Sequence, residues 1–207
     1  MGRGRQDLLN LATAREGHFR LESGHHGGLW LDLDALFADP LRIGSFVDEL
    51  ADKIRPYDPQ AVCGPLVGGA FLAQMLASRI QADFLFAERM PAVPGEGLYR
   101  ARYRLPRGLR ERALGKRIAI VDDAISAGSS VRATFDDLTA LGGQPVVVGA
   151  LLWLGSAALP FFEGRAPVES VSRVPYEMWQ PTDCPRCAAG LPLEDPADDG
   201  TRKKETL

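Results

Sequence analysis

The sequence predicts an α/β fold built on an open parallel sheet flanked by helices, and three observations carry this prediction. Short apolar runs alternate with helical patterns between residues 46 and 152. The run Ile118–Val121 contains no polar residue, which is typical of a strand that is buried on both faces of a parallel sheet. The 22 glycines and 15 prolines stand mainly between these segments, as loop residues do.

The first elements follow from the spacing of apolar residues. From Phe46 to Ile54 these residues recur at helical spacing, and Pro56 ends that helix. Residues 61–63 are uniformly apolar and predict a short strand. A second helix follows, whose buried side runs from Phe71 to Ile80.

The same alternation continues through the second half of the chain. Residues 83–87 and 118–121 predict two further strands, a helix is expected over residues 130–141, and residues 145–152 predict the next strand. Gly142 and Gly143 close the helix that precedes it. Strands and helices in this order imply right-handed crossovers and a sheet covered on both faces.

Segments outside this pattern define the expected domain organisation. Residues 1–45 form an N-terminal arm, residues 46–175 the core, residues 176–192 a segment with a Cys-x-x-Cys motif, and residues 193–207 a disordered tail. Within the core, residues 90–117 form a polar excursion that is too long for an ordinary connection between strands. Long excursions of this kind are usually functional or mobile.

Composition limits the function classes. The 207 residues are 45% hydrophobic and 25% charged, close to an ordinary soluble enzyme. The net charge of −3 argues against nucleic acid as a bulk partner, and no apolar run approaches the roughly 18 residues of a membrane span. The N-terminal sequence has no secretory signal, and three cysteines make no disulfide framework. We therefore expect a cytoplasmic protein.

The strongest chemical signal lies directly after the buried strand at 118–121. Asp122 and Asp123 follow it, at the carboxyl end of a parallel strand, where ligands collect in such sheets. Small residues and hydroxyls come next and open a helix whose N-terminus attracts anions: Ser126, Ala127, Gly128, Ser129 and Ser130. The carboxylates suit sugar hydroxyls or a hard cation, so the segment as a whole suits a phosphorylated ribose. The alternative is a solvated aspartate pair before a serine helix cap.

A second anion site is predicted after the strand at 61–63. Leu66, Val67, Gly68 and Gly69 lead into the next helix, and adjacent glycines let backbone N–H groups approach a ligand closely. Tight packing of the strand on the helix explains the same glycines. Beside the first loop, on the same edge of the sheet, this loop is a candidate pyrophosphate site.

The third signal is positive charge in the polar excursion. Residues 100–117 contain eight Arg and Lys residues against Glu111 alone. Arg100, Arg102 and Arg104 alternate with other residues, so in an extended hairpin they share one face. Such a flap could close over a polyphosphate and exclude water. The alternative is a solvated edge strand protected by charge.

The same residues do not match the motifs of several other enzyme classes. The segment 64–69 lacks the Lys-Ser or Lys-Thr that an ATPase phosphate loop requires. A hydrolase nucleophile at Ser126 would need a preceding glycine and a later histidine, and both are missing. Cys184 and Cys187 have metal-knuckle spacing but no second cysteine pair, so zinc there would need a symmetry mate or a distant histidine. Structural thiols are the alternative.

The segment from Val121 to Ser129 resembles the binding motif for phosphoribosyl pyrophosphate (PRPP) in type I phosphoribosyltransferases. More narrowly, the chain resembles the orotate phosphoribosyltransferases. Residues 17–26 are similar to the Phe-x-Leu-x-Ser-Gly opening of that family, and Phe86–Arg89 is similar to the stretch before its flexible loop. Residues 179–192 are similar to the C-terminal end of one bacterial branch.

The resemblance implies a fold, a reaction and a partner. The fold would be the type I phosphoribosyltransferase sheet with an N-terminal hood and a flexible basic hairpin. The reaction would transfer the 5-phosphoribosyl group of PRPP to a nucleobase, most simply orotate, giving orotidine 5′-monophosphate and pyrophosphate in pyrimidine biosynthesis. The flexible loop of the family usually reaches across a dimer interface, which implies a homodimer.

The resemblance also implies roles for individual residues. Asp122 and Asp123 would hold the ribose hydroxyls, directly or through Mg²⁺, and Ser126 to Ser130 would bind the 5-phosphate. Leu66 to Gly69 would bind pyrophosphate, with Arg89 reaching it from the side. The arm around Ser23 and Gly24 would form the hood over the base.

Two residue choices depart from the family pattern. The loop from Pro91 to Pro106 has neither Lys nor His, so Arg100 and Arg102 are the expected catalytic cations. They can stabilise a leaving pyrophosphate but cannot protonate it. Glu22 stands where many members have Lys and would repel an anionic base. A phosphoribosyltransferase for another base, and a PRPP-sensing regulator that binds nucleic acid, are the alternatives.

Overall fold

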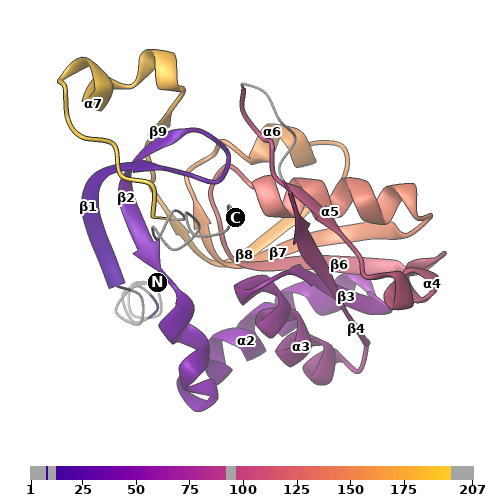
Figure 1. The fold of residues 1–207 in the computed structure, drawn as a ribbon. Coiled ribbons are helices and arrows are strands. Elements are labelled where there is room, and N and C mark those ends of the chain that lie inside the picture. The colour runs from indigo at the N-terminus through magenta and orange to yellow at the C-terminus, as the bar shows by residue number, and fades with distance from the viewer. Residues whose placement is uncertain (1–7, 9–12, 92–96, 197–207) are drawn as a thin grey trace, which may run out of the picture.

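The computed structural model describes residue 8, residues 13–91 and residues 97–196, apart from the side chain of Asp34. Its central element is a six-stranded sheet with the strand order β5-β4-β3-β6-β7-β8 (Figure 1). Strands β3, β4, β6, β7 and β8 are mutually parallel, and β5 pairs antiparallel with β4. The strand bounds are β3 Ala61–Pro65, β4 Asp83–Met90, β5 Arg102–Arg104, β6 Arg117–Ile125, β7 Gln144–Leu154 and β8 Val168–Val174.

Helices cover both faces of this sheet. Helices α2 (Pro40–Ile54) and α3 (Gly68–Ile80) lie on one face, where Val47, Leu50 and Leu76 pack against strand residues such as Val121. Helix α5 (Ser129–Ala140) and the short α6 (Leu159–Phe162) lie on the other, around Phe162. The short α4 (Arg110–Ala113) precedes β6. The expected parallel sheet covered on both faces is confirmed.

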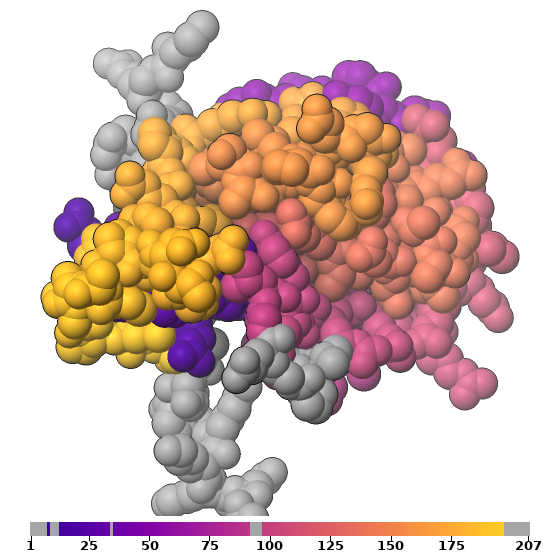
Figure 2. All heavy atoms as spheres, turned by 90° about the horizontal axis from the view of Figure 1, so that it is seen from above, coloured from indigo at the N-terminus to yellow at the C-terminus, as the bar shows by residue number. Residues whose placement is uncertain are grey.

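A second, smaller sheet stands at the side of the core. It contains β1 (Thr13–Arg20), β2 (His26–Asp32) and β9 (Met178–Trp179) in that order, all antiparallel. The C-terminal segment with the short helix α7 (Pro185–Ala188) lies against this N-terminal hairpin (Figures 1 and 2). Glu194 belongs to the tail that the sequence suggests, and its backbone bonds to His18 and Arg20 of β1. Residues 197–207 of that tail lie outside the described residues.

The expected elements of the core are all present; most have longer bounds, whereas α5 has the expected length and begins one residue earlier. The helix expected from Phe46 begins at Pro40, because Asp39 accepts hydrogen bonds from the Leu41 and Arg42 N–H groups and caps it. Strand β8 was not expected, because residues 168–174 alternate serine and charge with valine and are not a continuous apolar run.

Short 3-10 turns complete the secondary structure: η1 Asp34–Ala38, η2 Arg55–Tyr57, η3 Arg107–Leu109 and η4 Pro181–Asp183. Cys63 is fully buried in β3, and this burial raises the pKa of its thiol. No helix in the described part of the chain has both the length and the apolar character needed to cross a bilayer.

Candidate functional site

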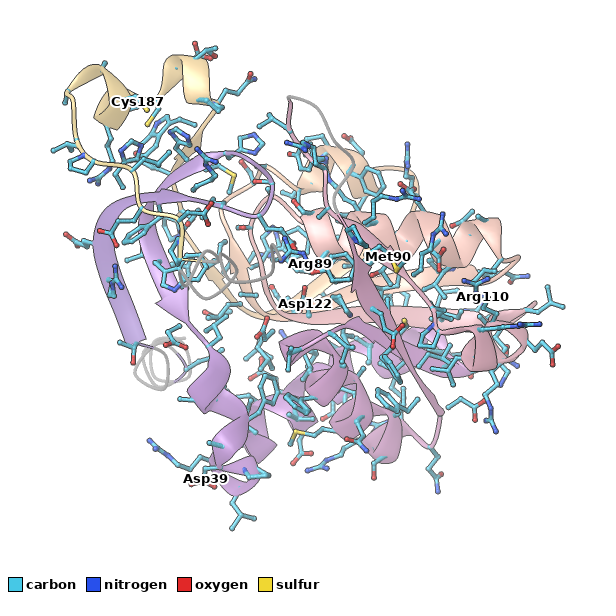
Figure 3. All side chains as sticks on the ribbon, in the orientation of Figure 1. Asp39, Arg89, Met90, Arg110, Asp122 and Cys187 are labelled. Carbon is cyan, nitrogen blue, oxygen red and sulfur yellow. The ribbon has the colours of Figure 1, made fainter. Side chains whose placement is uncertain are left out.

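Two carboxylates form the centre of the candidate site; we call Asp122 and Asp123 the acid pair. They lie near the carboxyl end of β6, beside the neighbouring parallel strand β3 (Figure 1), and Figure 3 labels Asp122 there. Asp122 is 7% exposed, and its carboxylate accepts hydrogen bonds from Ser130 Oγ at 2.8 Å and from the Asp123 N–H at 3.1 Å. Among the described residues, no Lys or Arg forms an ion pair with Asp122.

Burial and the adjacent Asp123 raise the pKa of Asp122 well above its usual range. A carboxylate that is buried beside a second carboxylate, without a basic partner, is stabilised by any cation brought to it. Carboxylate oxygens are also the ligands that Mg²⁺ prefers, in combination with oxygens of a bound phosphate. The acid pair therefore fits a magnesium ion.

The residues after the acid pair form what we call the phosphate loop, residues 126–130. Gly128 has φ 75°, a left-handed conformation that glycine adopts without strain, and helix α5 starts at the next residue. Within the described part of the chain, no side chain caps this helix, so the N–H groups of its first turn have no capping side chain. Ser129 Oγ is buried and has no hydrogen-bond partner among the described residues. Both features suit a bound anion.

Residues 66–69, the glycine loop, lie directly against the acid pair. A Cβ atom on Gly68 would lie 2.0 Å from Asp123 Oδ2, and one on Gly69 would lie 2.6 Å from Asp122 Oδ1. Only glycine therefore allows this loop to sit so close to both carboxylates. The Leu66–Val67 peptide bond is cis, and Gly68 and Gly69 are the first residues of α3.

The structure brings the phosphate loop together with the N-terminal hairpin. A cavity of about 110 Å³ is lined by the phosphate loop on one side and by Leu21, Glu22 and Ser23 on the other. Residues 21–25, the hairpin turn, join β1 to β2 through hydrogen bonds between Leu21 and His25 and between Gly24 and Leu21. Ser23 is buried, and Gly24 has φ 84°. Ser23 of the expected arm site and Ser126–Ser130 of the expected core site thus line one cavity.

Glu22 does not face the cavity with an uncompensated charge. Its Oε1 lies 3.2 Å from Arg89 Nε and accepts a hydrogen bond of 2.9 Å from the Tyr103 hydroxyl. Burial, and then the nearby Glu22 carboxylate, raise the pKa of Tyr103. Arg89, on β4, therefore binds the hairpin turn here, and Figure 3 shows it above Asp122.

The two expected catalytic arginines line different hollows. Arg100 lines a cavity of about 720 Å³ together with Ser23, Gly24 and Arg89. Arg102, on β5, lines a neighbouring cavity of about 350 Å³ beside Ser129. Neither arginine lines the small cavity next to the acid pair. Residues 92–96 of the loop between β4 and β5 lie outside the described residues.

Arg132 is a site residue that the sequence reasoning missed. Its guanidinium lies 4.1 Å from the Tyr99 ring centroid and 4.8 Å from that of Phe161. Arg132 Nε is buried without a hydrogen-bond partner among the described residues, and burial and Arg132 together lower the pKa of His25. Its spacing of three from Ser129 places both on one face of α5, and this helical spacing was the available signal.

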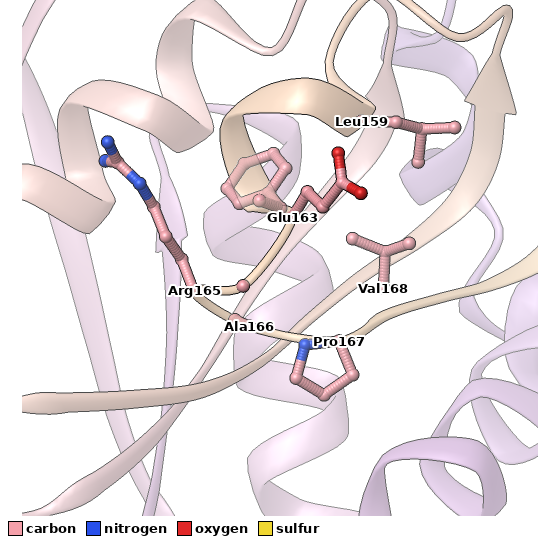
Figure 4. Close-up of a pocket in the computed structure, with 8 residues that line it drawn as sticks. Leu159, Glu163, Arg165, Ala166, Pro167 and Val168 are labelled. Atoms are coloured by element: carbon pink, nitrogen blue, oxygen red, sulfur yellow. The ribbon is translucent and has the colours of Figure 1, made fainter.

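A large cavity elsewhere is not part of this site. It has a volume of about 640 Å³ and is lined by Leu159 and residues 162–168, between α6 and the start of β8 (Figure 4). A single stretch of chain supplies all of its lining residues, and none of them belongs to the acid pair or to either loop. The small cavity beside the phosphate loop is the better candidate, because several elements place polar groups around it.

Comparison with known proteins agrees with this geometry. No family model matches the chain. The chain is 34% identical over 196 residues to an orotate phosphoribosyltransferase of Thermotoga petrophila, and the match covers 94% of this chain and 97% of that protein. Among solved structures, an adenine phosphoribosyltransferase from Rhodothermus marinus has a TM-score of 0.66 at 18% identity, covering 84% of this chain and 100% of that one.

A third similar protein is the orotate phosphoribosyltransferase from Aeropyrum pernix. It has a TM-score of 0.60 at 21% identity and covers 82% of this chain and 93% of that one. At such identities the two solved structures establish the fold, whereas the nearly full-length match to the Thermotoga protein establishes the family. This chain belongs to the orotate phosphoribosyltransferases, a family of type I phosphoribosyltransferases.

Proposed function

We propose that this protein transfers the 5-phosphoribosyl group of PRPP to orotate, producing orotidine 5′-monophosphate and pyrophosphate. The proposal rests on the family and on one structural observation. Gly68 and Gly69 allow the glycine loop to touch the acid pair, and the phosphate loop begins three residues after Asp123. Groups for pyrophosphate, ribose and 5-phosphate are therefore adjacent on one edge of the sheet, in the order in which PRPP carries them.

Each part of the site has a role in this reaction. Displacing pyrophosphate from C1 of the ribose builds positive charge on the sugar and negative charge on the leaving group. The acid pair would hold the ribose hydroxyls and stabilise the positive charge, and the N–H groups of the glycine loop would stabilise the pyrophosphate. Ser129 Oγ and the N-terminus of α5 would bind the 5-phosphate.

Asp122 and Asp123 would hold Mg²⁺ together with PRPP. When bound, the Mg²⁺ ion would supply positive charge that stabilises the departing pyrophosphate. Arg100 and Arg102 would add fixed positive charge from the hairpin of β4 and β5. The hairpin turn, with Ser23 and Gly24, would cover the base above Ser126. Because Arg89 and Tyr103 already bind Glu22, its charge is partly compensated, and an anionic base remains compatible with this turn.

An assay that follows the loss of orotate absorbance tests the proposal. Recombinant protein with PRPP and Mg²⁺ is expected to consume orotate, and the double variant Asp122→Asn/Asp123→Asn is expected to lose this activity. A panel of other pyrimidines and purines under the same conditions defines the acceptor. Turnover of another base without turnover of orotate would reject orotate as the substrate, and no turnover of any base would reject the transferase.

We also propose that the protein acts as a homodimer. Leu66, Val67 and Phe71 are exposed apolar residues at the glycine loop and the first turns of α3, and Phe37 contacts Phe71 with a ring separation of 5.7 Å. Exposed apolar patches on a protein surface mark sites of contact with other proteins, which supports a subunit interface here. Phe71→Glu is expected to shift the sedimentation of the protein from dimer to monomer.

Complementation between two inactive variants tests whether the loop acts across this interface. One variant lacks the acid pair, and the other carries Arg100→Ala and Arg102→Ala. Mixed dimers regain activity if the arginines act on the partner's site, because one site then has both sets of groups. No recovery after exchange of subunits, verified by sedimentation, would place the arginines in their own subunit's site.

A further inference from the structure

Four potential metal ligands meet outside the site described above. His18 on β1, His26 on β2, and Cys184 and Cys187 around α7 place their ligand atoms within 4.8 Å of one another. Cys187 lies in the C-terminal segment above the N-terminal hairpin (Figure 3). In the sequence these residues are up to 169 positions apart, so only the fold brings them together.

The distances between these atoms fit a tetrahedral ion. Zinc binds histidine nitrogen at about 2.0–2.1 Å and cysteine sulfur at about 2.3 Å, so its ligands lie roughly 3.3–3.8 Å apart. His18 Nε2 is 3.1 Å from His26 Nδ1, 3.4 Å from Cys184 Sγ and 3.7 Å from Cys187 Sγ. Cys187 Sγ is 3.2 Å from His26 Nδ1. Four of the six distances between ligand atoms are therefore close to those of a tetrahedral ion, and all six lie within 4.8 Å.

A partner outside the cluster orients one ligand. His18 Nδ1 lies 3.0 Å from the Leu191 carbonyl oxygen. A carbonyl can only accept a hydrogen bond, so His18 Nδ1 is the donor here and Nε2 is the ring nitrogen that faces the cluster. Metal-bound histidines are held in this way, with the second ring nitrogen donating to a carbonyl or carboxylate. His18, His26 and Cys184 are also buried, which excludes competing water from most of the cluster.

We propose that His18, His26, Cys184 and Cys187 bind a structural zinc ion. Nitrogen and sulfur ligands favour zinc over Mg²⁺ or Ca²⁺, which take oxygen. Four protein ligands leave no open position for a substrate, so the ion serves the fold and not the reaction. Thiolates of the Cys-x-x-Cys motif would bind as the anions and release their protons on binding.

Apart from the ion, the C-terminal segment would be held to the N-terminal hairpin by a short strand pairing, by backbone bonds of Glu194 to β1 and by the Arg15–Glu194 ion pair. Strand β9 pairs with β2 only at His26–Trp179 and Gly27–Met178. The segment from Cys184 to Leu191 is largely exposed, so it buries little apolar surface of its own. Small elements without a sufficient core are commonly stabilised by a metal. Here the zinc would attach the C-terminal segment to the N-terminal hairpin.

The position of the ligands links the ion to the active site. His18 and His26 stand on the two strands that flank the hairpin turn, residues 21–25, which lines the cavity beside the phosphate loop. A zinc ion that joins both strands would restrict the motion of this turn. This consequence rests on the proposed function, whereas the metal site itself does not.

Metal content decides the proposal. Full-length protein is expressed without a metal-binding tag, purified under reducing conditions and analysed by mass spectrometry for metals. About one zinc ion per chain is expected, and His26→Ala and Cys184→Ser are expected to lose it. His25→Ala and Cys63→Ala are matched controls that retain zinc, because His25 contacts Ser23 and Tyr99 and Cys63 lies in the core. A chelator is expected to lower the thermal midpoint of the wild type.

Cobalt absorption spectroscopy gives a second test of the metal site. It uses only the wild-type protein, so it does not depend on whether the variants fold. Wild-type protein that is reloaded with Co²⁺ is expected to show the intense absorption of a tetrahedral ion with thiolate charge transfer. An octahedral spectrum, or no binding of Zn²⁺ or Co²⁺ by the reduced protein, would overturn the proposal. So would zinc that remains bound in both His26→Ala and Cys184→Ser, or a Cys184–Cys187 disulfide in the protein as isolated under non-reducing, metal-replete conditions.

Activity provides the link to the turn. Removing the zinc is expected to raise the KM for the base more than the KM for PRPP, because the turn faces the base. Stoichiometric zinc with unchanged KM values would support the metal site and reject only the effect on the turn. Failure of the proposed transferase reaction would leave the metal analysis unaffected.

Discussion

Replacing Gly68 by alanine tests the contact between the glycine loop and the acid pair. The added methyl group would lie 2.0 Å from Asp123 Oδ2 and 2.7 Å from its Cγ. Ordinary carbon–oxygen contacts begin at about 3.4 Å, so the carboxylate must move by more than about 1 Å. A displacement of about 1 Å in a catalytic group costs on the order of 100-fold in rate, or about 3 kcal/mol of transition-state stabilisation.

The fold should tolerate this change, because the obstacle is the end of a side chain and not the backbone. Alanine is also favoured over glycine in a helix by up to about 1 kcal/mol, and Gly68 is the first residue of α3. We therefore expect kcat/KM for PRPP to fall roughly 100-fold while the thermal midpoint is unchanged or higher.

Two further glycine variants serve as controls for the Gly68→Ala measurement. Gly108→Ala is the matched control, because a Cβ there meets no atom within 4 Å, and it should keep wild-type kinetics. Gly64→Ala places its Cβ 1.9 Å from the Gly69 backbone oxygen and should unfold the loop and lower the thermal midpoint. Wild-type kcat/KM in Gly68→Ala would refute the reasoning that this contact positions the carboxylate.

Three more predictions concern the same site. Ser129→Ala removes a buried hydroxyl that has no hydrogen-bond partner among the described residues, so the ligand-free protein should be at least as stable as the wild type. PRPP binding, measured by calorimetry, should weaken about 10- to 100-fold. Equal affinity would contradict a contact between Ser129 and the phosphate. The pKa of Asp122 is raised in the folded state, so its charged form lowers stability at neutral pH. Asp122→Asn should raise the thermal midpoint of the ligand-free protein at pH 7, and this gain should disappear as the pH falls below about 3.8, where Asp122 is protonated in both states. Glu22→Gln removes a half-exposed ion pair with Arg89, which should change the free energy of unfolding by less than about 1 kcal/mol. The variant should also have a lower KM for orotate, because a negative charge is removed. A higher KM would mean that the Glu22 carboxylate contributes to orotate binding.

The sheet and the positions of the glycine loop and the phosphate loop could be predicted because each depends on neighbouring residues. The apolar run before Asp122 defines a buried strand whatever the rest of the chain does, and the small residues after Ala127 allow a tight turn into a helix. The start of α2 was placed too late because its apolar pattern begins after the cap at Asp39. Strand β8 was missed because its pattern is that of an edge strand, with serine and charge between valines.

The contacts between distant segments could not be predicted in the same way. The sequence showed Glu22 as an acid that would repel an anionic base, yet Arg89 and Tyr103 bind it from β4 and β5. It showed the Cys-x-x-Cys motif with only two potential metal ligands, and the fold places His18 of β1 and His26 of β2 beside it.

By itself, the sequence determined the features that lie in contiguous segments: the acid pair, the two loops and the alternation of apolar strands with helices that makes a parallel sheet. Only the tertiary structure decided which of these groups touch. The parallel register of β3 and β6 sets Gly68 and Gly69 against the two carboxylates, and the fold brings His18 to within 3.4 Å of Cys184. The physical reason is that backbone conformation depends on neighbouring residues, whereas burial of apolar surface and strand pairing act between residues that the sequence separates.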